Sequence, residues 1–124
     1  MDKENKMTSI EVVKNVVRAL DSKKAEDISV LKVEDLTSIT DYFVIAAANS
    51  TTQVKAIADE VEFKLKELGV MPNKTEGYTQ GNWVVLDYYQ VIVHVFNTET
   101  RQFYSLENLW RDGEKIDIKE FLDI

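Results

Sequence analysis

Two segments of the chain place apolar residues at the three- and four-residue spacing of an amphipathic helix. Before the first, Thr8 and Glu11 have the spacing of a capping box and predict a helix start near Thr8. The second follows Ser50, which has the same capping-box spacing to Gln53, and Gly69 and Pro72 mark its end. The first apolar stripe consists of Ile10, Val13, Val16, Val17 and Leu20. The second consists of Val54, Ile57, Ala58, Val61, Leu65 and Leu68.

Shorter apolar runs predict strands. Ile28–Val33 predicts a strand near a sheet edge, because Lys32 interrupts the run. Tyr42–Ala48 is apolar throughout and predicts a central strand that is covered on both faces. Met71–Asn82 is polar and contains two glycines, so it predicts a loop with room for one short strand.

The segment Trp83–Phe96 predicts two strands joined by a two-residue turn at Tyr89 and Gln90. Residues opposite each other in such a hairpin share a face of the sheet. One face is nearly all apolar and carries Val84, Leu86, Tyr88, Val91, Val93 and Val95. The other mixes aromatic, aliphatic, acidic and imidazole side chains, namely Trp83, Val85, Asp87, Ile92, His94 and Phe96. This mixture suits protein recognition. A hairpin covered on both sides, with His94 hydrogen-bonded inside, fits the pattern equally well.

The elements predict an α/β fold in one domain spanning residues 1–124. Thr98–Trp110 predicts a third helix, and the tail Glu114–Ile124 is compatible with a short one. The order is helix, strand, strand, helix, loop, two strands, helix. It predicts a mixed sheet of about four to five strands, with helices mainly on one face and the other face partly open.

Composition narrows the classes of function. The chain has no cysteine and one histidine, which excludes thiolate and multi-histidine metal sites. No apolar run is long enough for a membrane span, and the polar N-terminus predicts a cytoplasmic protein of bacterial type. A net charge of -7 disfavours broad nucleic-acid binding and fits a partner with a basic protein surface. We expect neither a metal nor a cofactor.

Two sequence features could carry chemistry. Asp41 and Asp87 could together hold Mg²⁺ for nucleotidyl transfer, but the Gly-Ser turn and Asp-x-Asp pair usual in nucleotidyltransferases are missing. We expect instead that Asp41 caps a turn and that Asp87 ends a strand. The polar run Asn49–Thr52 could bind an anion at a helix start, but no glycine-rich loop precedes it, so capping is the favoured role.

Three segments together resemble the ribosomal silencing factor family, also called the Iojap-like family. They are Thr40–Glu62 (TDYFVIAAANSTTQVKAIADEVE), Trp83–Phe96 (WVVLDYYQVIVHVF) and Arg101–Trp110 (RQFYSLENLW). The resemblance spans about residues 7–112 and leaves the tail, residues 113–124, unassigned. It implies a fold similar to a minimal nucleotidyltransferase without the catalytic signature. One departure is the turn, where the family usually has Gly-Asp and this chain has Tyr89 and Gln90.

The resemblance implies a translation repressor rather than an enzyme. Such proteins bind the large ribosomal subunit through its protein number fourteen and block joining of the small subunit, especially under nutrient limitation. Organellar relatives act in large-subunit assembly, and free members tend to form homodimers. The alternatives are a Mg-dependent nucleotidyltransferase-like enzyme and a ribosome-assembly adaptor. We expect the partner-binding residues to be the mixed hairpin face, extended by two residues of the last helix: Trp83, Val85, Asp87, Ile92, His94, Phe96, Tyr104 and Glu107.

Overall fold

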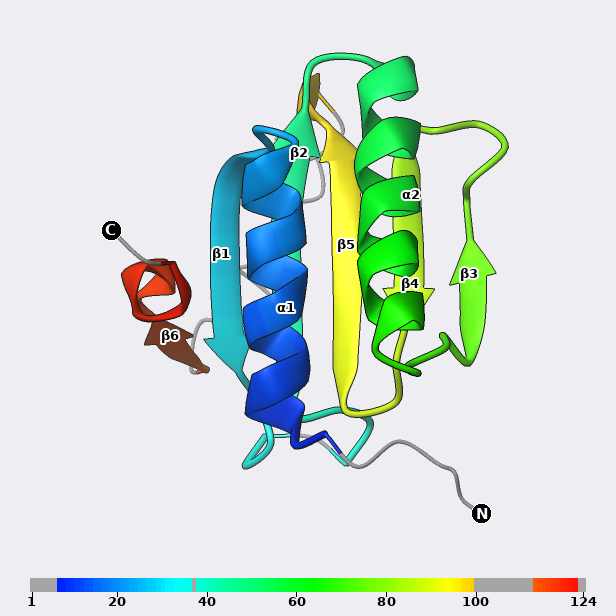
Figure 1. The fold of residues 1–124 in the computed structure, drawn as a ribbon. Coiled ribbons are helices and arrows are strands. Elements are labelled where there is room, and N and C mark those ends of the chain that lie inside the picture. The colour runs from blue at the N-terminus through cyan, green and yellow to red at the C-terminus, as the bar shows by residue number, and fades with distance from the viewer. Residues whose placement is uncertain (1–6, 37, 100–112, 123–124) are drawn as a thin grey trace.

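The computed structural model describes residues 7–36, 38–99 and 113–122. Within them one mixed sheet has the strand order β3-β4-β5-β2-β1-β6. The helices α1 (Ser9–Ser22) and α2 (Thr51–Glu67) both lie on one face of this sheet (Figure 1). The strands are β1 (Glu26–Lys32), β2 (Tyr42–Ala48), β3 (Lys74–Glu76), β4 (Trp83–Asp87), β5 (Val91–Asn97) and β6 (Glu114–Ile116).

The α/β class and the mixed sheet are confirmed, since β2 and β5 are parallel and the other neighbours antiparallel. The predicted strand count was too low, because the described residues form six strands. Both edge strands, β3 and β6, have only three residues and are polar, so β6 left no apolar signal. The β1 strand lies one position from the edge and β2 is central, as predicted.

The helix starts follow from their caps. Thr8 Oγ1 accepts a hydrogen bond from the backbone N–H of Glu11, whose carboxylate accepts one from the backbone N–H of Thr8. This is the predicted capping box of α1. Ser50 likewise caps α2 by accepting from the backbone N–H of Gln53. The Gln53 side chain, however, donates to the carbonyl of Lys23, so it ties α2 to the end of α1 instead of completing a second box.

The main core lies between the helices and the sheet. Most residues of the two predicted stripes are buried there. Ile10 and Leu68 are exceptions, with 40% and 50% of their surface exposed. Ile10 lies in the first turn of α1, and Leu68 is the C-cap of α2, so neither reaches the core.

The hairpin forms in the predicted register. Trp83 lies opposite Phe96 and Asp87 lies opposite Ile92. The turn has two residues, closed by a hydrogen bond of 2.8 Å from the Tyr88 backbone N–H to the Val91 carbonyl. Tyr89 takes a positive φ of 72°, a conformation that is strained for a residue other than glycine.

Two predicted elements lie near the C-terminus. Residues 98 and 99 are helical, and the rest of the range predicted for the third helix, Thr98–Trp110, lies outside the described residues. The tail forms a short 3₁₀ helix, η1 (Ile118–Phe121), which confirms the expectation of a short helix. Phe121 is buried in the main core, and its carbonyl accepts a hydrogen bond from Arg18 Nε of α1 at 2.8 Å.

Candidate protein-binding face

The sheet face away from α1 and α2, called the second face below, has its own smaller core. Strand alternation turns Phe43, Ile45 and Phe96 to this face, while their neighbours Val44 and Val95 pack under the helices. Leu31 and Val33 complete the buried set. Trp83 and Ile92, which are partly exposed, pack against its margin.

Among the described residues, four aromatic rings form a chain of contacts on the second face. Trp83 lies opposite Phe96, and their rings stack with centroids 5.0 Å apart. His94 stacks on Phe96 at 6.0 Å and meets the edge of Phe43 at 5.3 Å. Trp83 Nε1–H donates a hydrogen bond of 3.0 Å to His94 Nδ1. The hairpin register brings these residues together, because His94 lies diagonally across from Trp83.

The hydrogen bond defines the protonation state of His94. An indole N–H can only donate, so Nδ1 must carry a lone pair and the proton of the neutral ring must lie on Nε2. His94 is 7% exposed, and its Nε2 has no partner among the described residues. Burial lowers the pKa of His94 from 6.5 to about 4. The imidazole is therefore neutral near pH 7.

The predicted site residues divide into three groups. Trp83, Val85, Asp87 and Ile92 are partly exposed on the second face. Phe96 is fully buried and His94 nearly so, which means that the expectation of an open surface at these two positions is wrong. Their rings pack on one another and on Phe43 instead. Tyr104 and Glu107 lie outside the described residues.

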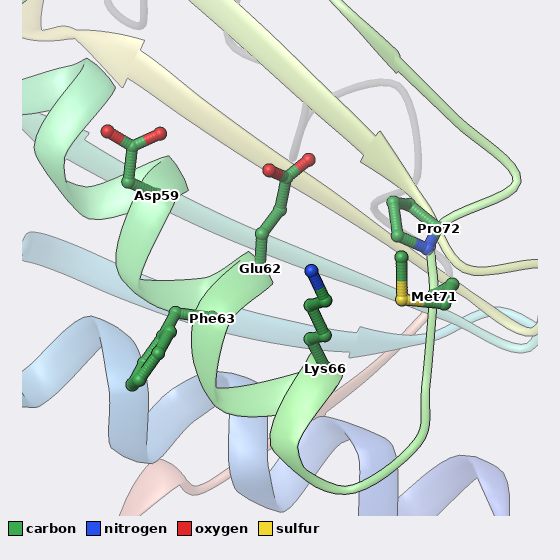
Figure 2. A pocket seen from close by; sticks show the side chains of 6 residues that line it. All are labelled: Asp59, Glu62, Phe63, Lys66, Met71 and Pro72. Carbon is green, nitrogen blue, oxygen red and sulfur yellow. The ribbon is translucent and has the colours of Figure 1, made fainter.

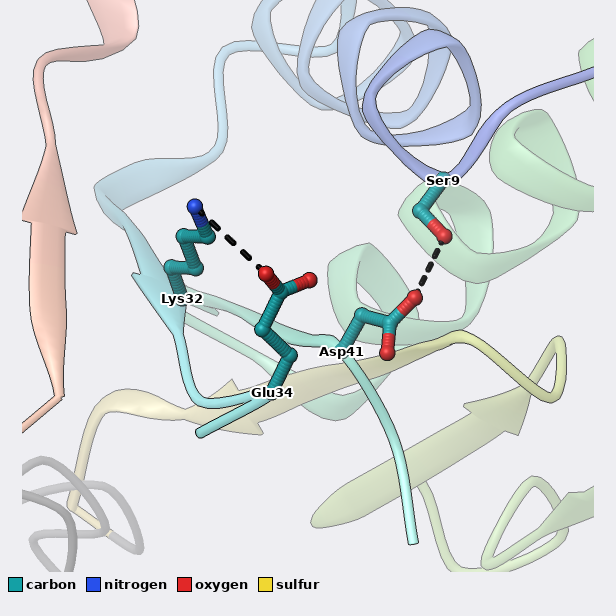
Figure 3. Close-up of polar contacts among 4 residues, drawn as sticks. All are labelled: Ser9, Lys32, Glu34 and Asp41. Atoms are coloured by element: carbon teal, nitrogen blue, oxygen red, sulfur yellow. Dashed lines mark hydrogen bonds and ion pairs between the residues drawn. The ribbon is translucent and has the colours of Figure 1, made fainter. Parts of the chain in front are cut away.

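The two aspartates considered for metal binding each have a local hydrogen-bond partner. Asp41 Oδ2 accepts from Ser9 Oγ at 2.7 Å, beside the exposed ion pair of Lys32 and Glu34 (Figure 3). Asp41 thus holds the first residue of α1 rather than capping a turn. Asp87 ends β4, as predicted, and its Oδ1 accepts from the Tyr89 backbone N–H at 2.8 Å. Among the described residues no group of three or more histidine and acidic side chains could hold a metal ion.

A shallow pocket of about 300 Å³ lies beside α2 (Figure 2), and it was not predicted from the sequence. Its two carboxylates are engaged, since Asp59 accepts from the Tyr78 hydroxyl at 3.0 Å and Glu62 from the Thr75 hydroxyl at 2.8 Å. Phe63 lies on α2 outside its apolar stripe. An aromatic residue at such a position was the only feature of the sequence that could have indicated the pocket. The pocket is lined by Asp59, Glu62, Phe63, Lys66, Met71 and Pro72.

Comparison with known proteins identifies the family. The family model described as "Ribosomal silencing factor during starvation" matches residues 6–123. The chain belongs to the ribosomal silencing factor family. The resemblance drawn from the three sequence segments is thereby confirmed. The match also includes most of the tail that the segments left unassigned.

Within the described residues, no helix has the length and apolar character needed to span a membrane.

Relatives of this family match most of the chain. The ribosomal silencing factor of Bacillus subtilis is 39% identical over 112 residues, which cover 90% of this chain and 95% of that protein. A crystal structure of a Chromobacterium violaceum protein has a TM-score of 0.83 and 39% identity, and covers 90% of this chain and 92% of that one. A mouse protein named "Mitochondrial assembly of ribosomal large subunit protein 1" is 33% identical over 77% of this chain and 43% of its own length.

Proposed function

We propose that this protein is a non-enzymatic translation repressor. It binds the large ribosomal subunit through its protein number fourteen and blocks joining of the small subunit, especially under nutrient limitation. The observation that carries the proposal is the family match over residues 6–123. Two bacterial relatives are named ribosomal silencing factors. We further propose that the free protein is a homodimer in a bacterial-type cytoplasm.

The second face supplies the contact in this proposal. Trp83 is the largest of the partly exposed apolar side chains on this face, and Val85 and Ile92 extend the apolar surface. Asp87 adds a negative charge on the same face, where it can pair with an arginine or lysine of a basic partner. The net charge of -7 favours encounter with such a partner. Tyr104 and Glu107 of the last predicted helix extend the patch in this proposal.

Repression then follows without chemistry. A protein seated on the surface of the large subunit that faces the small subunit excludes the small subunit by volume alone. No bond needs to be made or broken. The local hydrogen bonds of Asp41 and Asp87 support this, because they give both carboxylates a structural role. A nucleotidyltransferase-like reaction would require these two side chains for Mg²⁺.

Truncation of Trp83 tests the assigned face. We expect Trp83→Ala to weaken binding to purified large subunits by about 2–4 kcal/mol, because an aromatic anchor loses its buried area. The matched control is Phe63→Ala, since Phe63 is also a large apolar residue, 55% exposed, but lies on α2 over the opposite face. Binding is measured by co-sedimentation with separated subunits. Equal binding by both variants would contradict the assigned face, though not the family function.

The charge of Asp87 is tested separately from its role in the turn. Asp87→Asn keeps an oxygen that can accept from the Tyr89 N–H, but it removes the charge. We expect about tenfold weaker binding with a smaller dependence on salt, and a larger loss for Asp87→Lys, which places like charges together. A titration at two ionic strengths measures both effects. Unchanged affinity and salt dependence in Asp87→Asn would exclude a partner charge at this position.

Large-subunit assembly is the second candidate function. It is favoured by the name of the mouse mitochondrial relative. If the protein acts in assembly, cells that lack it should accumulate immature large subunits during growth in rich medium. If it acts as a repressor, rich-medium subunits should be mature, and the defect should appear on transfer to poor medium. Sucrose gradients of lysates from both conditions distinguish the two functions.

A further inference from the structure

Among the described residues, Phe96 and His94 hold Trp83 on the second face. The Trp83 ring stacks on Phe96 with centroids 5.0 Å apart and an angle of 29° between the planes. Stacking alone restricts the plane of the indole but leaves it free to flip about the Cβ–Cγ bond, which exchanges the two edges of the ring. The hydrogen bond of 3.0 Å from Nε1 to His94 Nδ1 removes this freedom, because it selects which edge of the indole faces the sheet.

His94 is itself fixed. Its ring lies nearly parallel to Phe96, at 9° and 6.0 Å, and meets the Phe43 ring edge-on at 85° and 5.3 Å. The imidazole is buried on this face, so it cannot turn to water without breaking these contacts. His94 therefore presents its Nδ1 lone pair in one direction, toward the indole of Trp83.

Stability does not account for an imidazole at this position. The proton of Nε2 is buried and has no partner among the described residues, which costs free energy. A phenylalanine would fill the same space between Phe43 and Phe96 without that cost. What phenylalanine lacks is the acceptor for the Trp83 N–H. The acceptor is thus the property that distinguishes His94 from the aromatic residues around it.

The geometry points to His94 as a positioning residue, which holds the Trp83 indole in the orientation that the ribosomal partner recognises. This inference rests on the proposed function, because it takes Trp83 as the contact. His94 does not touch the partner itself. It raises affinity by preorganisation, since an anchor that is already oriented loses less conformational entropy on binding.

Two substitutions separate the acceptor from the ring. His94→Phe keeps the ring and removes the acceptor, whereas His94→Asn removes the ring but keeps a carbonyl oxygen close to the position of Nδ1. We expect His94→Phe to fold with equal or higher stability and yet bind large subunits about three- to tenfold more weakly, the range expected for one hydrogen bond. We expect His94→Asn, measured where it is fully folded, to recover most of the affinity.

A spectroscopic readout tests the orientation directly. In ¹⁵N-labelled wild-type protein, a scalar coupling between Trp83 Nε1 and His94 Nδ1 should be observed across the hydrogen bond, and the Trp83→Phe variant assigns the signal. In His94→Phe the indole N–H should exchange faster with solvent. Absence of the coupling in the wild type overturns the inference, whatever the variants do.

The outcomes also separate this inference from the proposed function. Weak binding of both Trp83→Ala and His94→Phe supports the positioning role. Weak binding of Trp83→Ala with wild-type binding of His94→Phe overturns the positioning role and leaves the binding face intact. Wild-type binding of Trp83→Ala removes the face on which both depend. Equally weak binding by His94→Phe and His94→Asn also overturns the inference, because the acceptor then makes no difference.

Discussion

His94 links the pH of the solution to the stability of the fold. In the folded state burial lowers its pKa from 6.5 to about 4, whereas in the unfolded chain it titrates near 6.5. Between these values the unfolded state binds more protons than the folded state. The contribution of the neutral His94 to the free energy of unfolding is therefore fully present above pH 6.5 and is lost as the pH falls toward 4. Protonation also turns Nδ1 into a donor, which cannot accept the N–H of Trp83.

The titration of His94 can be followed without interference, because the chain has one histidine. We expect its imidazole NMR signals to titrate with a midpoint near pH 4. We also expect wild type to lose about 3 kcal/mol relative to His94→Phe between pH 6.5 and 4, measured by urea unfolding. The His94→Phe control removes the contribution of carboxylates. A midpoint near 6.5 would contradict the buried placement of this ring.

Tyr88 carries a buried hydroxyl whose effect on stability can be tested. It is 3% exposed in the main core, and its hydroxyl has no partner among the described residues. Burial, and to a smaller extent the charge of Glu62, raises its pKa. We expect Tyr88→Phe to leave the free energy of unfolding unchanged or to raise it by about 1 kcal/mol, because an unpaired buried hydroxyl is costly. A loss of more than about 1 kcal/mol in urea unfolding would mean that the hydroxyl is paired.

Whether a hairpin residue is buried was harder to predict than the face of the sheet on which it lies. Alternation along the hairpin assigned all of its residues correctly to one or the other side of the sheet. It could not tell that Phe96 and His94 are buried while Trp83 and Asp87 stay partly exposed. Burial depends on packing between strands distant in sequence, such as the contact of His94 with Phe43 of β2. Periodicity within one segment does not contain this information.

The β4–β5 hairpin carries strain at its turn. Tyr89 has a φ of 72°, where an L side chain costs about 1–2 kcal/mol. Glycine tolerates this conformation, so we expect Tyr89→Gly to be more stable than Tyr89→Ala by about 1 kcal/mol. Thermal and urea unfolding of both variants measure the difference. Tyr89→Phe is the control for the hydroxyl, which donates to Asn73 Oδ1 at 3.0 Å. Equal stability of the glycine and alanine variants would mean that the turn relaxes in solution.

Element boundaries were predictable wherever a cap or a turn marked them. The Thr8 capping box, the Ser50 cap and the two-residue hairpin turn all formed as the sequence indicated. The edge strands β3 and β6 were not marked in this way. Each has three mostly exposed residues, and its strand conformation depends on pairing with the neighbouring strand rather than on its own pattern.

The two faces of the sheet differ in the whole molecule. The face under α1 and α2 (Figure 1) holds the main core. The second face carries a smaller core and the partly exposed Trp83 and Asp87. The order of elements predicted the α/β class. The parallel pairing of β2 with β5 supplies the mixed character, and the helix α2 lies in the connection between them. The family, by contrast, was recognised from three sequence segments and not from the periodicity of apolar residues.

The proposed repressor acts by preventing subunit joining, and this effect can be measured with purified components. Purified large and small subunits are mixed under joining conditions with increasing amounts of this protein, and the products are separated on sucrose gradients. We expect joined ribosomes to decrease as the protein increases, and the protein to sediment with free large subunits. Undiminished joining at saturating protein, or sedimentation of the protein with small subunits alone, would contradict the proposed repression.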